Sequence, residues 1–363
     1  MNRRLLSAII GSLTLLSCSS RNAPPAASPP DGSSGAGVSP RLVQAAQGEN
    51  HFRAIRQVTF GGENAEAYFS NNGQWLTLQS TRDGHPCDQQ YVMRIDGSEL
   101  RRISEGRGKT TCGWFFPGDQ RLFFASTTAH DSICPPKPDP SRGYVWPLDR
   151  YDIYTVNRDG SGLRRLTYNN VYTAEGVLSP DGKRIVFTSL KDGDLEIYTM
   201  NADGSDVRRL TNTPGYDGGA WWSPDGKRIV YRANHPTDSV ELRAYRDLLA
   251  QRLVRPSRVE LFVMNADGSD QRQITRLGGA NFGPSWTPDG KRIIFSSNYL
   301  APRSGNFDLF LVNADGTGLE RITFDESFDG FPMFSPDGTK VVWASNRHAA
   351  KAGETNVFIA DWQ

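Results

Sequence analysis

The residues of this chain best suited to metal binding or chemical reaction are histidines and cysteines. They fall in short polar segments between runs of apolar residues. The histidines in these segments are His85, His130, His235 and His348. Imidazole and thiolate groups are common zinc ligands, and imidazole also combines with carboxylates at other divalent metals. The spacing matches no zinc motif. Our leading expectation is therefore that the protein has no cofactor. The alternative is a divalent metal such as zinc or manganese.

Three cysteines occupy the first part of the same region and are candidates for a disulfide. They are Cys87, Cys112 and Cys134. In an oxidising compartment two of the three are expected to pair, with the third left free or buried. The favoured pairs are Cys87 with Cys134 and Cys87 with Cys112, and the sequence does not choose between them.

A third set of polar residues stands at the start of an apolar run in each of six related segments. Its members are Asn64, Thr110, Thr173, Asp217, Asn281 and Asp329. If the segments form a ring, these side chains should surround a channel mouth that takes a peptide terminus, a sugar or a cation. Alternatively, such residues satisfy the amides of the turns in which they stand.

The elements that would position these residues are predicted by an internal repeat. The sequence S-P-D-G-K-R-I at 179–185 recurs, with small changes, at 223–229, 287–293 and 335–341, and weaker copies begin at Ser70 and Phe116. Alternating β-type runs and a second turn, N-A-D-G, follow the full copies. Four short antiparallel strands per repeat are typical of propeller blades. We therefore predict an all-β, six-bladed propeller with four-stranded blades.

Closure of the ring is also predicted by the repeat. The last copy ends at its third strand, around Val357 to Trp362, and has no fourth. The run Ile55 to Thr59 matches the fourth strand at Val207 to Thr211 and should complete the last blade. Such pairing would remove an exposed sheet edge.

The paired S-P-D-G-K-R-I and N-A-D-G motifs resemble the repeat of TolB-like propellers, from about residue 52 to the end. This resemblance implies a non-catalytic, protein-binding scaffold. The chain has no G-x-S-x-G nucleophile motif, so enzymatic activity is left open with a leaning against it. Some similar propellers look like metal-assisted oligouronate lyases, which makes a metal-dependent enzyme acting on polysaccharide the alternative. Its candidate residues are the four histidines with Asp217 and Asp329.

One face of the predicted propeller carries the long connections. They fall in the second turns, at 126–150 and 234–258, with shorter ones at 81–89 and 346–354. Long connections on a rigid scaffold often hold binding sites, so we expect the site on this face. The segment 240–249 suits a short amphipathic helix, which either covers the channel or packs on its own blade. The aromatic residues before the first turns, including Trp114, Trp221 and Trp222, are expected in the core between blades.

The first residues predict export and anchoring. Arg3 and Arg4 precede an apolar run that ends in Leu15-Leu16-Ser17-Cys18, and this ending resembles the lipobox of bacterial lipoproteins. The expected organisation is a signal peptide over 1–17, a flexible linker over 18–50 with lipidated Cys18, and a propeller over 51–363. Ser19 favours the outer membrane, facing the periplasm.

The charge balance limits the partners. The chain has 41 basic and 40 acidic residues, a formal net charge of +1. No basic surplus is present to attract nucleic acid. The expected partner is an envelope protein or peptide, with membrane contact only through the lipid anchor and the protein itself a monomer.

Overall fold

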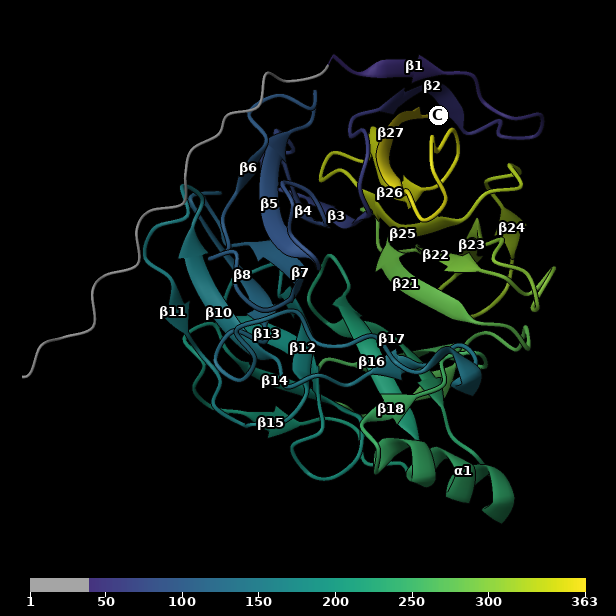
Figure 1. The fold of residues 1–363 in the computed structure, drawn as a ribbon. Helices are drawn as coiled ribbons and strands as arrows, with labels where there is room; N and C mark the ends of the chain where they lie inside the picture. Colours follow the sequence, from purple (N-terminus) through teal and green to yellow (C-terminus); the bar gives the residue numbers. More distant parts are fainter. Residues whose placement is uncertain (1–38) are drawn as a thin grey trace, which may run out of the picture.

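The computed structural model describes residues 39–363, which form six antiparallel sheets around a central axis (Figure 1). The inner strands are β3 (Asn64–Phe69), β7 (Thr110–Phe115), β12 (Thr173–Leu178), β16 (Tyr216–Trp222), β21 (Asn281–Trp286) and β25 (Asp329–Phe334). The second strands are β4 (Trp75–Ser80), β8 (Arg121–Ser126), β13 (Arg184–Ser189), β17 (Arg228–Asn234), β22 (Arg292–Ser297) and β26 (Lys340–Ser345). The predicted six-bladed propeller is confirmed.

The outer half of each blade is shorter at its edge. The third strands are β5 (Gln89–Arg94), β10 (Asp152–Asn157), β14 (Glu196–Asn201), β19 (Glu260–Asn265), β23 (Asp308–Asn313) and β27 (Asn356–Trp362). The fourth strands of the first five blades are β6 (Arg101–Arg102), β11 (Arg164–Arg165), β15 (Arg208–Arg209), β20 (Arg272–Gln273) and β24 (Glu320–Arg321). Two-residue edge strands offer little unpaired backbone to other chains.

The repeated turns are held by their own side chains. In the first turn of the third blade, Ser179 Oγ donates to Asp181 Oδ1 at 2.6 Å, and the Lys183 amide donates to the same oxygen at 3.1 Å. Gly182 then takes a φ of +72°, which is open to glycine without steric cost. The S-P-D-G motif is thus the sequence of a tight hairpin turn.

The last blade contains both ends of the described chain. Strand β2 (Phe52–Gln57) pairs antiparallel with β27, with Arg56 opposite Ile359, and this confirms the predicted closure (Figure 1). Strand β1 (Arg41–Val43) adds a fifth strand outside β2. The expected linker boundary at residue 50 is therefore wrong for residues 39–50, because this segment pairs with the sheet and buries Glu49. The signal peptide and Cys18 lie outside the described residues.

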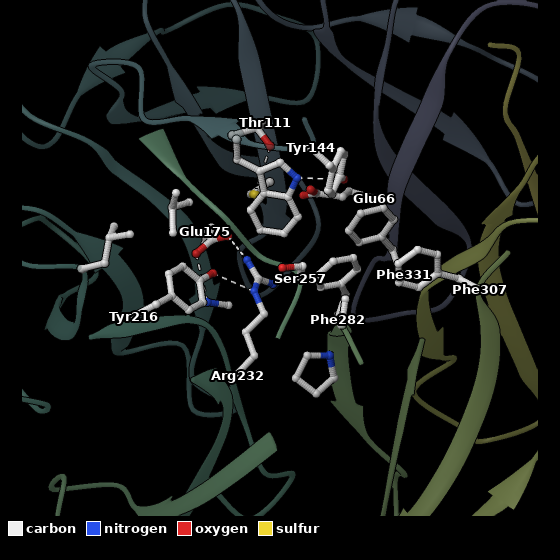
Figure 2. Close-up of a pocket in the computed structure, with 18 of the residues that line it drawn as sticks. Glu66, Thr111, Tyr144, Glu175, Tyr216, Arg232, Ser257, Phe282, Phe307 and Phe331 are labelled. Atoms are coloured by element: carbon white, nitrogen blue, oxygen red, sulfur yellow. Dashed lines mark hydrogen bonds and ion pairs between the residues drawn. The ribbon is translucent and has the colours of Figure 1, made fainter. Parts of the chain in front are cut away.

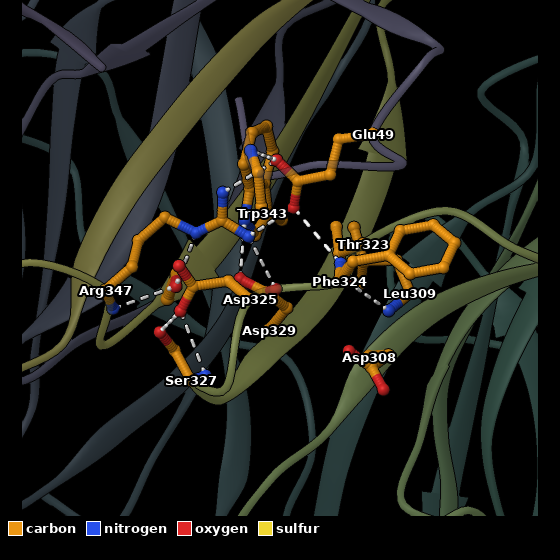
Figure 3. Close-up of polar contacts among 12 residues, drawn as sticks. Glu49, Asp308, Leu309, Thr323, Phe324, Asp325, Ser327, Asp329, Trp343 and Arg347 are labelled. Atoms are coloured by element: carbon orange, nitrogen blue, oxygen red, sulfur yellow. Dashed lines mark hydrogen bonds and ion pairs between the residues drawn. The ribbon is translucent and has the colours of Figure 1, made fainter. Parts of the chain in front are cut away.

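A buried ion-pair group holds this N-terminal segment to the last blade (Figure 3). Arg347 Nη2 lies 2.7 Å from Asp329 Oδ2 and 3.0 Å from Glu49 Oε1. Glu49 also accepts a hydrogen bond from the Phe324 amide at 3.2 Å. We call Glu49, Asp329 and Arg347 the closure triad.

Each inner strand carries a bulge at the same position. The register between the inner and second strand shifts in every blade, as between Ala65 and Tyr68 in the first. In each blade the first bulge residue without a partner on the second strand takes a left-handed conformation, with φ between 49° and 59°. These residues are Glu66, Cys112, Glu175, Gly219, Gly283 and Phe331. We call them the bulge ring.

The second turns of the second and fourth blades form a layer over one face. The first holds η1 (Pro140–Arg142) and β9 (Trp146–Pro147), and the second holds α1 (Ser239–Leu249) and β18 (Leu253–Val254). Strands β9 and β18 pair with each other, so two insertions from different blades form one small sheet. Helix α1 confirms the predicted amphipathic segment. Within residues 39–363, no helix is both long and apolar enough to cross a membrane.

Candidate binding cavity

The polar ring expected at the channel mouth is buried instead. All six of its side chains are fully covered, and they bond within the protein. Asp217 Oδ1 lies 2.9 Å from His235 Nε2, Asp329 binds Arg347, and Asn64 Oδ1 accepts from Ser80 Oγ at 2.8 Å. The prediction for Asn64, Thr110, Thr173, Asp217, Asn281 and Asp329 as channel-mouth residues is therefore wrong. The bulge turns the residue two positions later toward the axis.

The histidines do not come together. His85 contacts Arg102, His130 Nε2 lies 2.7 Å from Asp152 Oδ2, and His235 pairs with Asp217, each within its own blade. His348 lies exposed in the last blade. Among residues 39–363, no group of three or more His, Cys, Asp or Glu side chains is arranged to hold a metal ion. The predicted histidine metal site is thus not formed among the described residues, because His85, His130 and His235 serve contacts in separate blades and His348 is exposed.

Of the two favoured disulfides, the structure forms Cys87–Cys134, with the two Cα atoms 5.8 Å apart. This bond ties the second turn of the first blade to the insertion of the second. Cys112 is free and buried. It belongs to the bulge ring and lies at the axis of the propeller.

A cavity of about 660 Å³ opens inside the bulge ring on the face that carries the insertions (Figure 2). All six bulge-ring residues line it, and the β9 and β18 segments contribute Trp146 and Val254 to its wall. The cavity therefore lies on the face for which binding was predicted.

Aromatic residues from three blades close the axis below the cavity. Trp114 and Trp221 lie with ring centroids 4.8 Å apart, and Tyr68 packs on both at 5.6 and 5.2 Å. Because these rings come from the first, second and fourth blades, they fill the channel at this level. Trp222 lies in the core between blades as expected, and Trp114 and Trp221, which meet at the axis, also pack against core clusters between blades. The cavity is thus a blind pocket.

The cavity walls are largely aromatic. The rings that line it belong to Tyr144, Trp146, Tyr151, Tyr172, Tyr216, Phe282, Phe307, Phe328 and Phe331. Trp146 packs on Phe282 at 5.1 Å and donates its indole N–H to Tyr144 Oη at 2.8 Å. Rings of this kind bind apolar groups, and their faces also attract cations.

One charged pair in the wall is fully engaged within the protein. Arg232 comes from β17 and binds Glu175 across the boundary between the third and fourth blades (Figure 2). Its Nε also donates to Tyr216 Oη at 2.7 Å, and Glu175 accepts from the Gly219 amide at 3.0 Å. Burial opposes the charge of Arg232, but Glu175 together with Tyr216 and Tyr172 outweighs this effect and raises the pKa of Arg232.

Glu66, in contrast, has no cationic side chain bonded to it. Its Oε2 is covered and has no hydrogen-bond partner in the described structure. Burial raises the pKa of Glu66 to about 7, the Cys112 thiol lowers it by a hydrogen bond, and Glu175 raises it further. Burial likewise raises the pKa of Cys112, so its thiol stays protonated. A thiol that stays protonated is a poor nucleophile.

The cavity combines an apolar wall, an internally paired Arg232 and Glu175, and one carboxylate, Glu66, without a bonded cation. Sequence reasoning missed Glu66, Glu175 and Arg232. A usable signal existed, because two other blades carry glycine at the same repeat position, Gly219 and Gly283, which suits a left-handed residue.

Part of the chain matches the model of a known protein family. Two overlapping segments, residues 147–246 and 245–352, match the family model described as the TolB beta propeller domain, and together they span more than half of the chain. Dipeptidyl-peptidase 5 of Porphyromonas gingivalis is 51% identical over 39 residues, which make up 11% of this chain and 6% of that protein. The chain thus matches only a small part of the length of that relative.

Solved structures share the fold. A structure assigned to TolB from Agrobacterium tumefaciens aligns with a TM-score of 0.55 at 18% identity, covering 83% of this chain and 91% of that one. An oligogalacturonate lyase in complex with manganese aligns with a TM-score of 0.51 at 13% identity, covering 90% and 98%. At these identities the likeness concerns the fold alone.

Proposed function

Because this chain belongs to the TolB β-propeller domain family, we propose that it is a binding propeller whose cavity receives a segment of a partner protein in the cell envelope. The observation that carries the proposal is the blind, aromatic cavity on the face with the long connections. Pockets that bind ligands are concave and largely apolar with a few polar groups, as this one is.

The setting we propose is the periplasmic side of the outer membrane. The lipobox-like segment ending at Cys18 supports lipid anchoring, and the segment between Cys18 and β1 would tether the propeller. The protein would act as a monomer. Metabolic labelling with a palmitate analogue should mark the wild-type chain and not Cys18→Ser.

The test of the function uses full-length protein purified in detergent and a displayed library of random peptides. Peptides that bind should lose at least about tenfold in affinity for Trp146→Ala, because this change removes an aromatic wall of the cavity. Tyr168→Ala is the matched control, since Tyr168 is 70% exposed and does not line the cavity. Equal affinity of the selected peptides for wild type and Trp146→Ala would place binding elsewhere and refute the proposal.

The alternative of a metal-dependent polysaccharide lyase has less support. It needs imidazole and carboxylate groups that converge on one ion, and His85, His130 and His235 are engaged in separate blades. Elemental analysis of protein purified without chelator checks this. We expect no stoichiometric zinc or manganese and no change in unfolding temperature with EDTA. A stoichiometric metal would revive the lyase hypothesis.

A further inference from the structure

We infer that the ligand of the cavity carries a primary ammonium group, which binds Glu66, attached to an apolar body that packs on the aromatic walls. The inference rests on the proposed function and names the chemistry of the partner segment. A peptide supplies such a group in two ways, as its N-terminal amine or as a lysine side chain.

The first step of the argument concerns the charges inside the cavity. Glu175 and Arg232 neutralise each other, and Glu175 also accepts the Gly219 amide. Glu66 has only the neutral thiol of Cys112 beside it, and its Oε2 has no partner. An ionised carboxylate in such a place is costly unless a cation or donors complete it.

The second step excludes a cation from the protein itself. Lys109 lines the cavity, but its charge acts on two other carboxylates, Asp88 and Asp149. Arg303 is exposed in the connection between β22 and β23. Neither forms an ion pair with Glu66 in the described structure, and Arg232, whose charge lowers the pKa of Glu66 through space, is bonded to Glu175 instead. The missing positive charge is therefore best supplied from outside.

The third step concerns the kind of cation. The walls next to the carboxylate are rings, and a ring face attracts an ammonium group while it also covers apolar atoms. At about 660 Å³ the cavity holds more than a hydrated metal ion, and the described residues around it present no set of metal ligands. A side chain or chain end with a charged tip matches both features.

Backbone geometry points in the same direction. Glu66 holds a left-handed conformation at φ 49°, which is strained for a residue other than glycine. Glycine occupies the corresponding position in two blades and would relieve this strain. Strained backbone positions cluster at functional sites such as ligand-binding cavities.

The test uses three dipeptide amides as probes: Phe-Phe-amide with a free amine, its N-acetylated form, and N-acetyl-Phe-Lys-amide. Binding to full-length protein is measured by calorimetry at pH 7.5. At least one of the two probes with an ammonium group should bind about tenfold or more tightly than N-acetyl-Phe-Phe-amide. Which of the two does so distinguishes a chain terminus from a lysine.

Glu66→Gln should abolish this preference while the protein still folds. Glu99→Gln is the matched control, because Glu99 is an exposed carboxylate outside the cavity that pairs with Arg94. Equal binding of all probes, no measurable binding of any, or an unchanged preference in Glu66→Gln would overturn the inference. If library peptides lose affinity for Trp146→Ala but not for Glu66→Gln, the inference of an ammonium group is refuted. The proposed function is then still supported.

Discussion

At the scale of single residues, the cavity depends on groups held in unfavourable states. Glu66 keeps a carboxyl whose pKa lies near 7, and four of the six bulge-ring residues adopt a left-handed conformation without being glycine. Such features reduce stability and are retained where the surrounding structure imposes them. Two substitutions measure these effects separately.

The first prediction concerns Glu66 and pH. The pKa of Glu66 is raised from 4.5 to about 7 on folding, so the folded state holds a proton that the unfolded chain has released. Its contribution to stability is complete below pH 4.5 and is lost as pH rises through 7, by about 2–3 kcal/mol. In urea unfolding, the free energy of unfolding of Glu66→Gln should therefore rise relative to that of wild type between pH 4.5 and 8. A constant difference over this range would contradict the assignment.

The second prediction concerns Gly219. Gly219 has a φ of +58°, and a Cβ atom there would collide with the guanidinium of Arg232. Gly219→Ala should lower the free energy of unfolding by at least about 2 kcal/mol more than Gly61→Ala. Gly61 is a matched control because it has a φ of +72° with no atom near its Cβ position. Similar losses in both variants would show that only the backbone conformation matters.

At the scale of elements, the cavity combines the inner strands of the repeat with insertions that lie outside it. The small sheet of β9 and β18 joins the insertions of the second and fourth blades, and Tyr245 of α1 donates a hydrogen bond to the Gly215 carbonyl at 2.9 Å. The Cys87–Cys134 disulfide fixes the start of the second-blade insertion to the first blade. These cross-links position Trp146 over the bulge ring.

The third prediction concerns this disulfide. Loss of the bond in a Cys87→Ser, Cys134→Ser double variant should lower stability by about 2–4 kcal/mol. Reductant should produce a similar loss in wild type, measured by urea unfolding. Cys112→Ser keeps the disulfide and should keep the sensitivity to reductant. If reductant does not change the urea midpoint of wild type, the bond does not stabilise the protein and the prediction is wrong.

At the scale of the whole molecule, closure of the ring joins the two ends of the described chain. Strand β2 completes the last blade, and the closure triad ties residue 49 to that blade in a fully buried position. Burial raises the pKa of Asp329, while Arg347 lowers it. One guanidinium therefore serves two carboxylates away from water.

The fourth prediction concerns Arg347. Arg347→Met leaves Glu49 and Asp329 buried without a cation, and it should lower the free energy of unfolding by about 3–5 kcal/mol at pH 8. The loss should shrink at pH 5, where Asp329 is more readily protonated. Arg94→Met is the control, because its exposed pair with Glu99 should contribute less than about 1 kcal/mol. Equal losses in the two variants would contradict a structural role for the triad.

Strand and turn positions follow from the sequence because they depend on local rules. Alternation of apolar residues, the Asp-Gly turns and the fixed repeat period each act over a few neighbouring residues. The same period exposes the missing fourth strand, so the pairing of β2 with β27 was predictable. The linker boundary was not, because β1 is only three residues long and is held by the sheet.

The cavity was decided by the tertiary structure. Whether a strand residue faces the axis depends on the bulge, which shifts the register and turns Glu66 inward while it buries Asn64. The partners of Arg232 and Arg347 come from distant parts of the chain, and burial is the largest cause of the raised pKa of Glu66 and of Asp329. The sequence by itself thus determined the repeat and the ring, since these are local and periodic. Packing around the axis determined which side chains line the cavity, because that depends on contacts between blades.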